Sequence, residues 1–230
     1  MTPNIAIMPF VSVIMPVRNE ADFIARSLCA VLSQEWPADK MEVIVADGMS
    51  TDRTRQLIQT LMLQHANLKL VDNLGRIAPT GLNAALRAAV GEIIVRVDGH
   101  CEIAPDYVRR CVEHLTAQPE IDCVGGPIET IGGSTVSQAI ALGMSSTFGV
   151  GGSPFRTVTG KTLLVDTVAF PAYRQCMMQQ AGWFDEELVR NQDDEYSYRM
   201  RKLGAKILLA ADVHARYYSR SSLSSLWRQY

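Results

Sequence analysis

The sequence Gly-Glu-Ile-Ile-Val-Arg-Val-Asp-Gly-His, at residues 91–100, sets the expected fold of the chain. Its Ile and Val content predicts a buried strand that ends at Asp98-Gly99-His100. In an open α/β sheet, ligands bind outside the carboxyl ends of the strands, and Gly99 permits a tight bend there. Because this bend can turn a carboxylate and an imidazole toward one point, Asp98 and His100 form a candidate divalent-metal site.

The residues before this strand alternate between expected strands and expected helices. Strands are expected at 10–17, 41–46 and 68–71, and helices at 22–34, 50–63 and 80–90. Such alternation implies right-handed crossovers between parallel strands. The expected fold class is therefore α/β, a Rossmann-like domain with a mostly parallel central sheet and helices on both faces.

The pattern is less regular after residue 100. We expect helices at 105–115, 173–181 and 192–203, and strands at 123–126, 162–169, 206–210 and 213–218. Residues 136–144 are compatible with a helix, and the glycine-rich run at 149–152 suggests a loop. Because the sequence has no repeat, low-complexity block or linker, we expect a single domain over residues 1–230.

Composition and charge limit the classes of protein. With 230 residues, 47% apolar and 20% charged, the chain can bury a core and resembles an ordinary soluble globular protein. Its net charge of −2 gives no electrostatic basis for binding nucleic acid. The five cysteines form no C-x-x-C pair, so buried free thiols in a reducing compartment are expected. No signal peptide is recognisable, and no apolar run reaches the about 18 residues of a membrane span. These features predict a soluble, cytosolic chain.

Polar residues follow the first two expected strands. Pro16–Glu20 replaces the G-x-G-x-x-G motif of a dinucleotide-binding fold and is by itself a turn. Asp47-Gly48, with Ser50 and Asp52 after it, can cap the next helix. Alternatively, Asp47 can accept a hydrogen bond from a base or ribose at the edge of the sheet. The residues alone leave both roles of Asp47 open.

Three consecutive acids, Asp193-Asp194-Glu195, follow Gln192 at the expected start of a helix. Acids at a helix N-terminus are favoured by the helix dipole, which also lowers their basicity. A general base here would need partial burial or an acceptor hydroxyl within hydrogen-bonding distance.

Together, these motifs and their order resemble a family 2 glycosyltransferase with the GT-A fold. Within that family, the resemblance is to the succinoglycan-biosynthesis glycosyltransferases of the ExoA type, and it extends from about residue 10 to 225. It is carried by Val-Ser-Val-Ile-Met-Pro-Val-Arg-Asn-Glu at 11–20, Ile-Val-Ala-Asp-Gly-x-Ser-x-Asp at 44–52, Asn83, Val-Asp-Gly-His at 97–100 and Asn-Gln-Asp-Asp-Glu-Tyr-Ser-Tyr-Arg at 191–199.

The resemblance implies a nucleotide-sugar donor, usually a UDP-sugar such as UDP-glucose, bound by the half at about 1–100. The half at about 101–220 would bind the acceptor. The residues implied at the donor are Pro16, Val17, Asn19, Glu20, Asp47, Gly48, Arg76 and Asp98. Asp98 and His100 occupy the D-x-D position of the family, with histidine in place of the second acid, and would hold Mn²⁺ or Mg²⁺.

The resemblance also implies the chemistry. Asp193 occupies the position of the catalytic base, with Gln192 where glutamate is usual and Asp194 as the adjacent alternative. The base would take a proton from an acceptor hydroxyl, whose oxygen displaces the nucleoside diphosphate and inverts the anomeric carbon. The resemblance further suggests that residues 149–152 and Trp183 border the acceptor pocket.

The last residues raise the question of a membrane. Relatives commonly continue into membrane-embedded helices, so residues 221–230 are expected to begin a C-terminal helix that is truncated here. This implies a lipid-linked or saccharide acceptor at the cytoplasmic face of the inner membrane. The apolar positions with helical spacing are Leu223, Leu226, Trp227 and Tyr230. An apolar stripe of this kind, flanked by Arg220 and Arg228, is more often packed against a core than against a membrane.

Two other functions stay open from the sequence. A metal-dependent nucleotidyltransferase also uses an α/β sheet, but a Gly-rich loop with Lys or Arg would then be expected after the first strand. A non-catalytic nucleotide-binding module could retain Asp47 without transfer activity. His100 and Gln192 keep this last alternative open, since both depart from the usual family residues.

Overall fold

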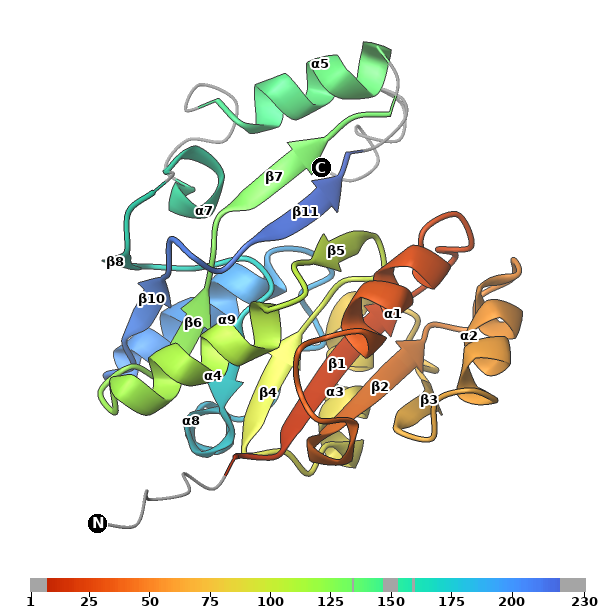
Figure 1. The fold of residues 1–230 in the computed structure, drawn as a ribbon, viewed down its shortest axis with the longest axis horizontal. Helices are drawn as coiled ribbons and strands as arrows, with labels where there is room; N and C mark the ends of the chain where they lie inside the picture. Colours follow the sequence, from red (N-terminus) through yellow and green to blue (C-terminus); the bar gives the residue numbers. More distant parts are fainter. Residues whose placement is uncertain (1–7, 134, 147–152, 159, 220–230) are drawn as a thin grey trace.

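A computed structural model describes residues 8–133, 135–146, 153–158 and 160–219 of the chain (Figure 1). Its strands form two sheets. The main sheet has eight strands in the order β3-β2-β1-β4-β9-β6-β10-β8, and a smaller sheet has three in the order β5-β11-β7. In Figure 1 the smaller sheet stands above the main one, with a helix packed along it.

The first half follows the alternation that the sequence predicts. Its elements are β1 (Val11–Val17), α1 (Ile24–Leu32), the short helix η1 (Ala38–Lys40), β2 (Met41–Asp47), α2 (Thr54–Met62), β3 (Leu68–Asp72), α3 (Ala78–Ala88) and β4 (Ile93–Arg96). Strand β1 pairs in parallel with both β2 and β4, and β2 pairs in parallel with β3. Every carboxyl end of these four strands therefore lies at the same edge of the sheet.

The second half is mixed. Its elements are β5 (Cys101–Ile103), α4 (Tyr107–Ala117), β6 (Cys123–Gly125), β7 (Ile128–Ile131), α5 (Thr135–Met144), α7 (Pro154–Thr157), β8 (Leu163–Val165), β9 (Ala172–Arg174), α8 (Gln175–Ala181), α9 (Gln192–Lys202), β10 (Ile207–Leu209) and β11 (Ala215–Tyr218). Strand β9 is antiparallel to both β4 and β6, and β8 is antiparallel to β10. The expected α/β fold with a large, mostly parallel central sheet is confirmed.

Two expectations for the second half are wrong in detail. The helix expected at 173–181 begins only at Gln175, because the residues before it pair with β4 and β6 as β9. The strand expected at 162–169 is limited to Leu163–Val165. The last expected strand forms as β11, which pairs with β5 and β7 in the smaller sheet.

Alternate residues of the central strands face two apolar layers. Helices α1, α2 and α4 bury residues such as Leu28 and Ile58 with Val13 of β1 on one face. Helices α3, α8 and α9 bury residues such as Leu82 and Tyr196 with the next β1 residue, Ile14, on the other face. Helices thus cover both faces of the main sheet, as expected.

Backbone strain is concentrated at one edge of this sheet. Non-glycine residues with positive φ are rare because their Cβ crowds the backbone. In the described part of the chain they are Asn19, Met49, Arg76, Phe170 and Asn191. The first three follow the carboxyl ends of β1, β2 and β3, Phe170 precedes the antiparallel β9, and Asn191 precedes α9. Such clustering is typical of a functional edge.

Candidate functional site

The loops after β1 and β2 are joined by hydrogen bonds. The Asn19 side-chain oxygen accepts from the Thr51 N–H at 2.8 Å, and the Asn19 N–H donates to the Ser50 hydroxyl at 2.9 Å. The Ala21 N–H donates to the Asp52 carboxylate at 3.1 Å. These bonds fix Asn19 in its positive-φ conformation and make the two loops one surface at the carboxyl edge.

Asp47, at the end of β2, is completely buried. Its carboxylate accepts from the Ser50 hydroxyl at 2.5 Å and from Arg55 at 3.2 Å. Arg55 also pairs with Asp72 at the end of β3, at 2.7 Å. A base would therefore compete with Ser50 or Arg55 for this carboxylate. Beside it, a Cβ on Gly48 would lie 3.1 Å from the Arg18 side chain, so this turn is closely packed.

The loop after β3 closes onto the loop after β1. Arg18 Nη1 donates to the backbone carbonyl of Arg76 at 3.2 Å. The Asn73 side chain accepts from the Arg76 N–H at 3.2 Å and from the Thr80 hydroxyl at 2.7 Å. Arg76 is exposed at this edge. Pro16 and Val17, the last residues of β1, lie at the same edge, half-buried and buried respectively.

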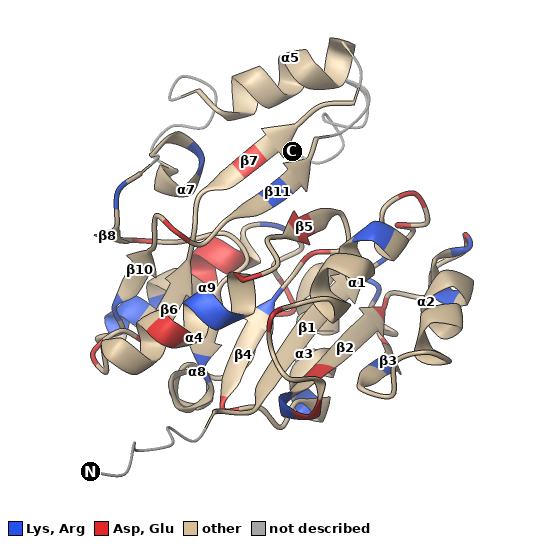
Figure 2. Cartoon of the chain, in the orientation of Figure 1, with Lys and Arg blue, Asp and Glu red and all other residues tan. Residues whose placement is uncertain are grey.

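Sequence analysis missed Arg96, the last residue of β4. Its Nε donates to Asp98 Oδ1 at 3.1 Å and its Nη2 to Oδ2 at 3.5 Å, with only 8% of its side chain exposed. In Figure 2 the end of β4 is blue in an otherwise uncharged strand. A lone arginine in a strand of Ile and Val, two residues before an aspartate, is the signal that could have indicated a buried ion pair.

Asp193, the expected base, lies near this pair. Burial alone would lower the pKa of Arg96, but the charges of Asp98 and Asp193 outweigh that effect and raise it. The guanidinium thus interacts electrostatically with one carboxylate from the loop after β4 and with another from the start of α9. Partial burial raises the pKa of Asp194, the charge of Asp193 raises it further, and a hydrogen bond with Thr167 opposes both. The structure therefore brings Asp193, rather than Asp194, to the charge of Arg96.

His100 and Glu20 form a second pair at the same edge. Nδ1 of His100 lies 3.0 Å from Oε1 of Glu20, and only 14% and 12% of the two side chains are exposed. The Tyr217 ring of β11 packs against the imidazole edge-on, with the ring centroids 5.1 Å apart. The resemblance placed Glu20 at the nucleoside, and the structure gives its carboxylate a partner in His100.

Asp98 and His100, the expected metal ligands, follow the end of β4, and each has another partner in the structure, Arg96 for Asp98 and Glu20 for His100. Among the described residues, no group of three or more His, Cys, Asp or Glu side chains is placed to hold an ion. Asp98 and His100 would therefore supply two ligands, and a diphosphate would complete the shell. A carboxylate with an imidazole favours Mn²⁺ or a similar ion over Mg²⁺. The Asp98 carboxylate retains acceptor capacity beyond the two bonds to Arg96.

Trp183, expected at the border of the acceptor pocket, lines a cavity of about 370 Å³ with residues of α3 and α8, including Leu86 and Met178. Arg87 stacks 5.1 Å from the centre of its ring. No residue expected at the donor lines this cavity. The glycine-rich run at 149–152, the other expected border of the acceptor pocket, lies outside the described residues, as do residues 221–230.

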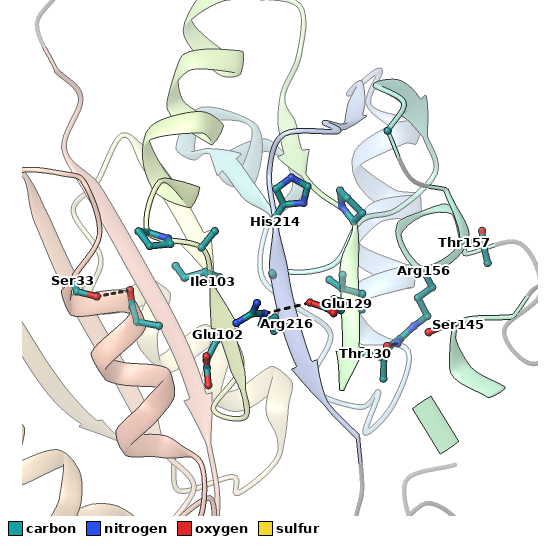
Figure 3. A pocket seen from close by; sticks show the side chains of 17 residues that line it. Ser33, Glu102, Ile103, Glu129, Thr130, Ser145, Arg156, Thr157, His214 and Arg216 are labelled. Atoms are coloured by element: carbon teal, nitrogen blue, oxygen red, sulfur yellow. Dashed lines mark hydrogen bonds and ion pairs between the residues drawn. The ribbon is translucent and has the colours of Figure 1, made fainter. Parts of the chain in front are cut away.

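A second cavity of about 940 Å³ lies on the smaller sheet (Figure 3). Ser33, from the loop directly after α1, lies at one side and Arg156 of α7 at the other, with Glu102, Glu129 and Arg216 between them. Arg216 pairs with Glu129 at 3.3 Å. None of the expected donor, metal or catalytic residues lines this cavity.

Two expectations about the whole chain can be compared with the structure. All five cysteines are free, and Cys101, Cys111 and Cys123 are buried as expected. The expectation of burial is wrong for Cys29 and Cys176, which are exposed. Within the described ranges, no helix combines the length and the apolar character needed to cross a bilayer.

Known proteins resemble this chain over most of its length. A model of the family described as "Glycosyl transferase family 2" matches residues 12–186. Succinoglycan biosynthesis protein ExoA of Rhizobium meliloti (strain 1021) is 31% identical over 227 residues, which are 95% of this chain and 66% of that protein. The dolichyl N-acetyl-alpha-D-glucosaminyl phosphate 3-beta-D-2,3-diacetamido-2,3-dideoxy-beta-D-glucuronosyltransferase of Methanococcus voltae is 28% identical over 96% of this chain and 71% of that protein.

Solved structures show the same fold. The mannosyltransferase PcManGT from Pyrobaculum calidifontis, in complex with GDP-Man and Mn²⁺, has a TM-score of 0.74 at 24% identity, over 97% of this chain and 61% of that one. S. aureus TarS in complex with UDP-GlcNAc has a TM-score of 0.72 at 21% identity, over 93% of this chain and 59% of that one. From the family match and the fold together, the chain belongs to glycosyl transferase family 2 and has the GT-A fold.

Proposed function

We propose that this chain is the catalytic domain of an inverting glycosyltransferase. It would move a hexose from a UDP-sugar, such as UDP-glucose, to a saccharide or lipid-linked acceptor. The observation that carries the proposal is the position of Arg96, which pairs with Asp98 at 3.1 Å and lies within the field of Asp193. Asp98, on the donor side, and Asp193, the candidate base, thus both interact electrostatically with the buried guanidinium of Arg96.

The donor would lie along the carboxyl edge of β1 to β4. The proposed donor residues are Pro16, Val17, Asn19, Glu20, Asp47, Gly48, Arg76 and Asp98. The hydrogen bonds that join Asn19 to the β2 loop, and Arg18 to the β3 loop, support a preformed surface here. Exposed Arg76 is suited to the charge of a diphosphate. Residues 1–100 would form this donor half of one domain, and residues 101–220 the acceptor half.

Asp193 would act as the base. It accepts the proton of an acceptor hydroxyl, that oxygen bonds to the anomeric carbon, and the bond to the nucleoside diphosphate breaks. One displacement inverts the anomeric carbon, so an α-linked donor gives a β-linked product. Asp98 and His100 would hold a divalent metal, which when bound supplies charge neutralisation for the departing diphosphate.

The relatives support the acceptor class. Those that resemble this chain over most of its length include a succinoglycan biosynthesis protein and an enzyme named for a dolichyl-phosphate substrate. We therefore propose an acceptor in polysaccharide or glycolipid biosynthesis. A lipid-linked acceptor would place the domain at the cytoplasmic face of a membrane.

Binding of the donor tests the proposal directly. The melting temperature is measured with UDP, GDP and their common sugar conjugates, each with and without Mn²⁺. A ligand at 100 times its Kd stabilises the folded state by about 2.7 kcal/mol, which a thermal shift resolves. We expect a Mn²⁺-dependent rise with one UDP-sugar, followed by transfer or slow hydrolysis of that sugar. A rise with nucleoside triphosphates alone would indicate a nucleotidyltransferase, and binding without turnover would indicate a non-catalytic module.

A further inference from the structure

The Glu20 carboxylate and the His100 imidazole join the loop after β1 to the loop after β4. We propose that Glu20 is a positioning residue, which fixes His100 so that its Nε2 binds the divalent metal. This rests on the proposed donor site at Asp98 and His100. It assigns to Glu20 an indirect role through His100, in addition to its place beside the nucleotide.

The hydrogen bond determines which nitrogen is available. An ionised carboxylate can only accept, so the 3.0 Å contact between Glu20 Oε1 and His100 Nδ1 places a proton on Nδ1. A neutral imidazole with its proton there carries its lone pair on Nε2. No described residue forms a hydrogen bond with Nε2. Histidine ligands of metals usually donate their other N–H to a carboxylate or carbonyl in this way, which fixes the ring and raises its basicity.

Close packing enforces the pair. The two side chains are nearly buried, at 12% and 14% exposed. A Cβ on Gly99 would lie 2.9 Å from Val17 Cγ1 and 3.2 Å from Glu20 Cγ, so the turn lies directly against the end of β1 and against Glu20. Tyr217 holds the imidazole from another side, with the two ring planes at 72°. The plane of the His100 ring is therefore fixed before any metal arrives.

The backbone of the turn is held independently of the imidazole. The Ser27 hydroxyl of α1 donates to the Gly99 carbonyl at 2.9 Å, and the Cys101 N–H donates to the Asp98 carbonyl at 3.3 Å. The Tyr218 N–H donates to the His100 carbonyl at 3.4 Å. Removal of the Glu20 carboxylate should therefore release the imidazole without releasing the turn, so metal affinity and stability can be separated.

The experiment measures Mn²⁺ affinity, with Mn²⁺ alone and with Mn²⁺ plus UDP, for the wild type, Glu20→Gln and Glu20→Ala. Calorimetry gives the Kd, and pulsed EPR detects the ¹⁴N coupling of an imidazole bound to Mn²⁺. The wild type should show this coupling, and His100→Ala should lose it. Glu20→Ala should weaken Mn²⁺ binding by about 10- to 100-fold, the usual effect of losing such a partner. The side chain of Glu20→Gln can still accept a hydrogen bond from His100 Nδ1–H, so this variant should lose less Mn²⁺ affinity than Glu20→Ala.

A matched control breaks another histidine–carboxylate pair. His114 of α4 lies 2.7 Å from Asp212, and neither residue belongs to the proposed site. Asp212→Ala should lower the melting temperature and leave the Kd for Mn²⁺ unchanged. This control shows that loss of a histidine–carboxylate pair does not by itself weaken metal binding.

The outcomes separate the two proposals. Equal Mn²⁺ affinity in the wild type and both Glu20 variants would overturn the positioning role, and so would imidazole coupling that persists in Glu20→Ala at unchanged strength. The proposed transferase would survive either result. If the wild type binds a UDP-sugar but shows no ¹⁴N coupling, the His100 metal ligand is wrong while donor binding stands. If the wild type binds no nucleotide sugar, the proposed function itself fails.

Discussion

The Arg96 guanidinium lies 3.1 Å from the Asp98 carboxylate, at the end of an otherwise apolar strand. A buried charge is costly unless it is paired, so the position of each group depends on the other. Arg96 is also affected by the charge of Asp193, which comes from the other half of the chain. Three charges, two negative and one positive, therefore define the centre of the proposed site.

Loss of the Arg96 cation should be costly. Arg96→Met leaves Asp98 unpaired beside the charge of Asp193, and we expect the free energy of unfolding to fall by about 3 kcal/mol, the lower end for a broken buried pair. The lower end applies because 23% of the Asp98 side chain is exposed. Arg96→Lys keeps the positive charge but not the planar guanidinium that makes two bonds to Asp98, so its free energy of unfolding should fall by less. Urea unfolding measures the free energy of unfolding of both variants. An Arg96→Met variant as stable as the wild type would contradict the stabilising role of the Arg96–Asp98 pair.

Substitution of the proposed base should separate binding from turnover. Asp193→Asn keeps the shape of the side chain but cannot take a proton, so kcat should fall by about 10²- to 10⁴-fold. The affinity for the UDP-sugar should stay close to that of the wild type. Turnover and the donor Kd are measured together. Retained turnover with weakened donor binding would show that another group is the base.

Asp194→Asn is the matched control for that experiment. Because burial and the Asp193 charge raise the pKa of Asp194, its ionised form is disfavoured in the folded state. Above the pKa of the folded state, removal of this charge should therefore leave stability unchanged or raise it slightly. Transfer should persist. A loss of transfer in Asp194→Asn with normal activity in Asp193→Asn would reverse the two roles.

A buried hydrogen-bond network at the amino edge of the sheet should make the free energy of unfolding depend on pH in the acidic range. Glu42 accepts from Lys69 at 2.7 Å, from the Ser12 hydroxyl at 2.6 Å and from the Val90 N–H at 2.9 Å. Burial alone would raise the pKa of Glu42, but these bonds outweigh it and hold the pKa below its ordinary value of 4.5. The stabilisation is therefore present above pH 4.5 and is lost as the pH falls through the lower, folded-state pKa.

Glu42→Gln tests this network. Near pH 7 the substitution should lower the free energy of unfolding by about 1–3 kcal/mol. Lys69 loses its ion-pair partner, and the Ser12 hydroxyl and the Val90 N–H lose a charged acceptor. The difference in unfolding free energy between wild type and variant should shrink as the pH is lowered below 4.5. Chemical unfolding at several pH values measures it. A difference that is constant with pH would show that Glu42 titrates alike in the folded and unfolded chain.

The turn at Gly99 should tolerate no side chain. In Gly99→Ala the new Cβ would meet the stiff Val17 side chain at 2.9 Å, and we expect a loss of about 1–3 kcal/mol from overpacking. Displacement of Glu20 should also weaken Mn²⁺ binding. Gly143 of α5 is the control, since a Cβ there meets no atom within 4 Å. Gly143→Ala should stabilise the chain by about 0.5–1 kcal/mol through helix propensity. Equal effects at the two glycines would contradict the packing at the turn.

The first half of the fold could be predicted from the sequence because its strands and helices are long and regularly patterned. Strand Met41–Asp47, for example, is fully buried and contains the uninterrupted apolar run 43–46. The second half contains strands of three residues, such as Cys101–Ile103 and Ala172–Arg174, which are too short to show a period. Their existence depends on pairing with distant strands, and local sequence does not encode that pairing.

The candidate site was predictable only in part for a similar reason. Motif order predicts that Asp98, His100 and Asp193 belong to one site, although these residues come from separate parts of the sequence, and their shared role stays a prediction. The partners of these residues could not be predicted, because Arg96 and Glu20 acquire their roles from side-chain packing in three dimensions. The full burial of Asp47 likewise follows from its contacts with Arg55 and Ser50, which no spacing rule specifies.

The position of β9 also has a consequence for synthesis of the chain. Strand β4 pairs with β1 early in the sequence, but its other edge is completed only when Ala172–Arg174 arrives. Long-range pairings of this kind close slowly, and an open apolar edge can recruit strands of other molecules. A nascent chain that has not yet reached residue 172 therefore leaves one edge of β4 without its native partner, and that edge stays open to strands of other molecules until β9 forms.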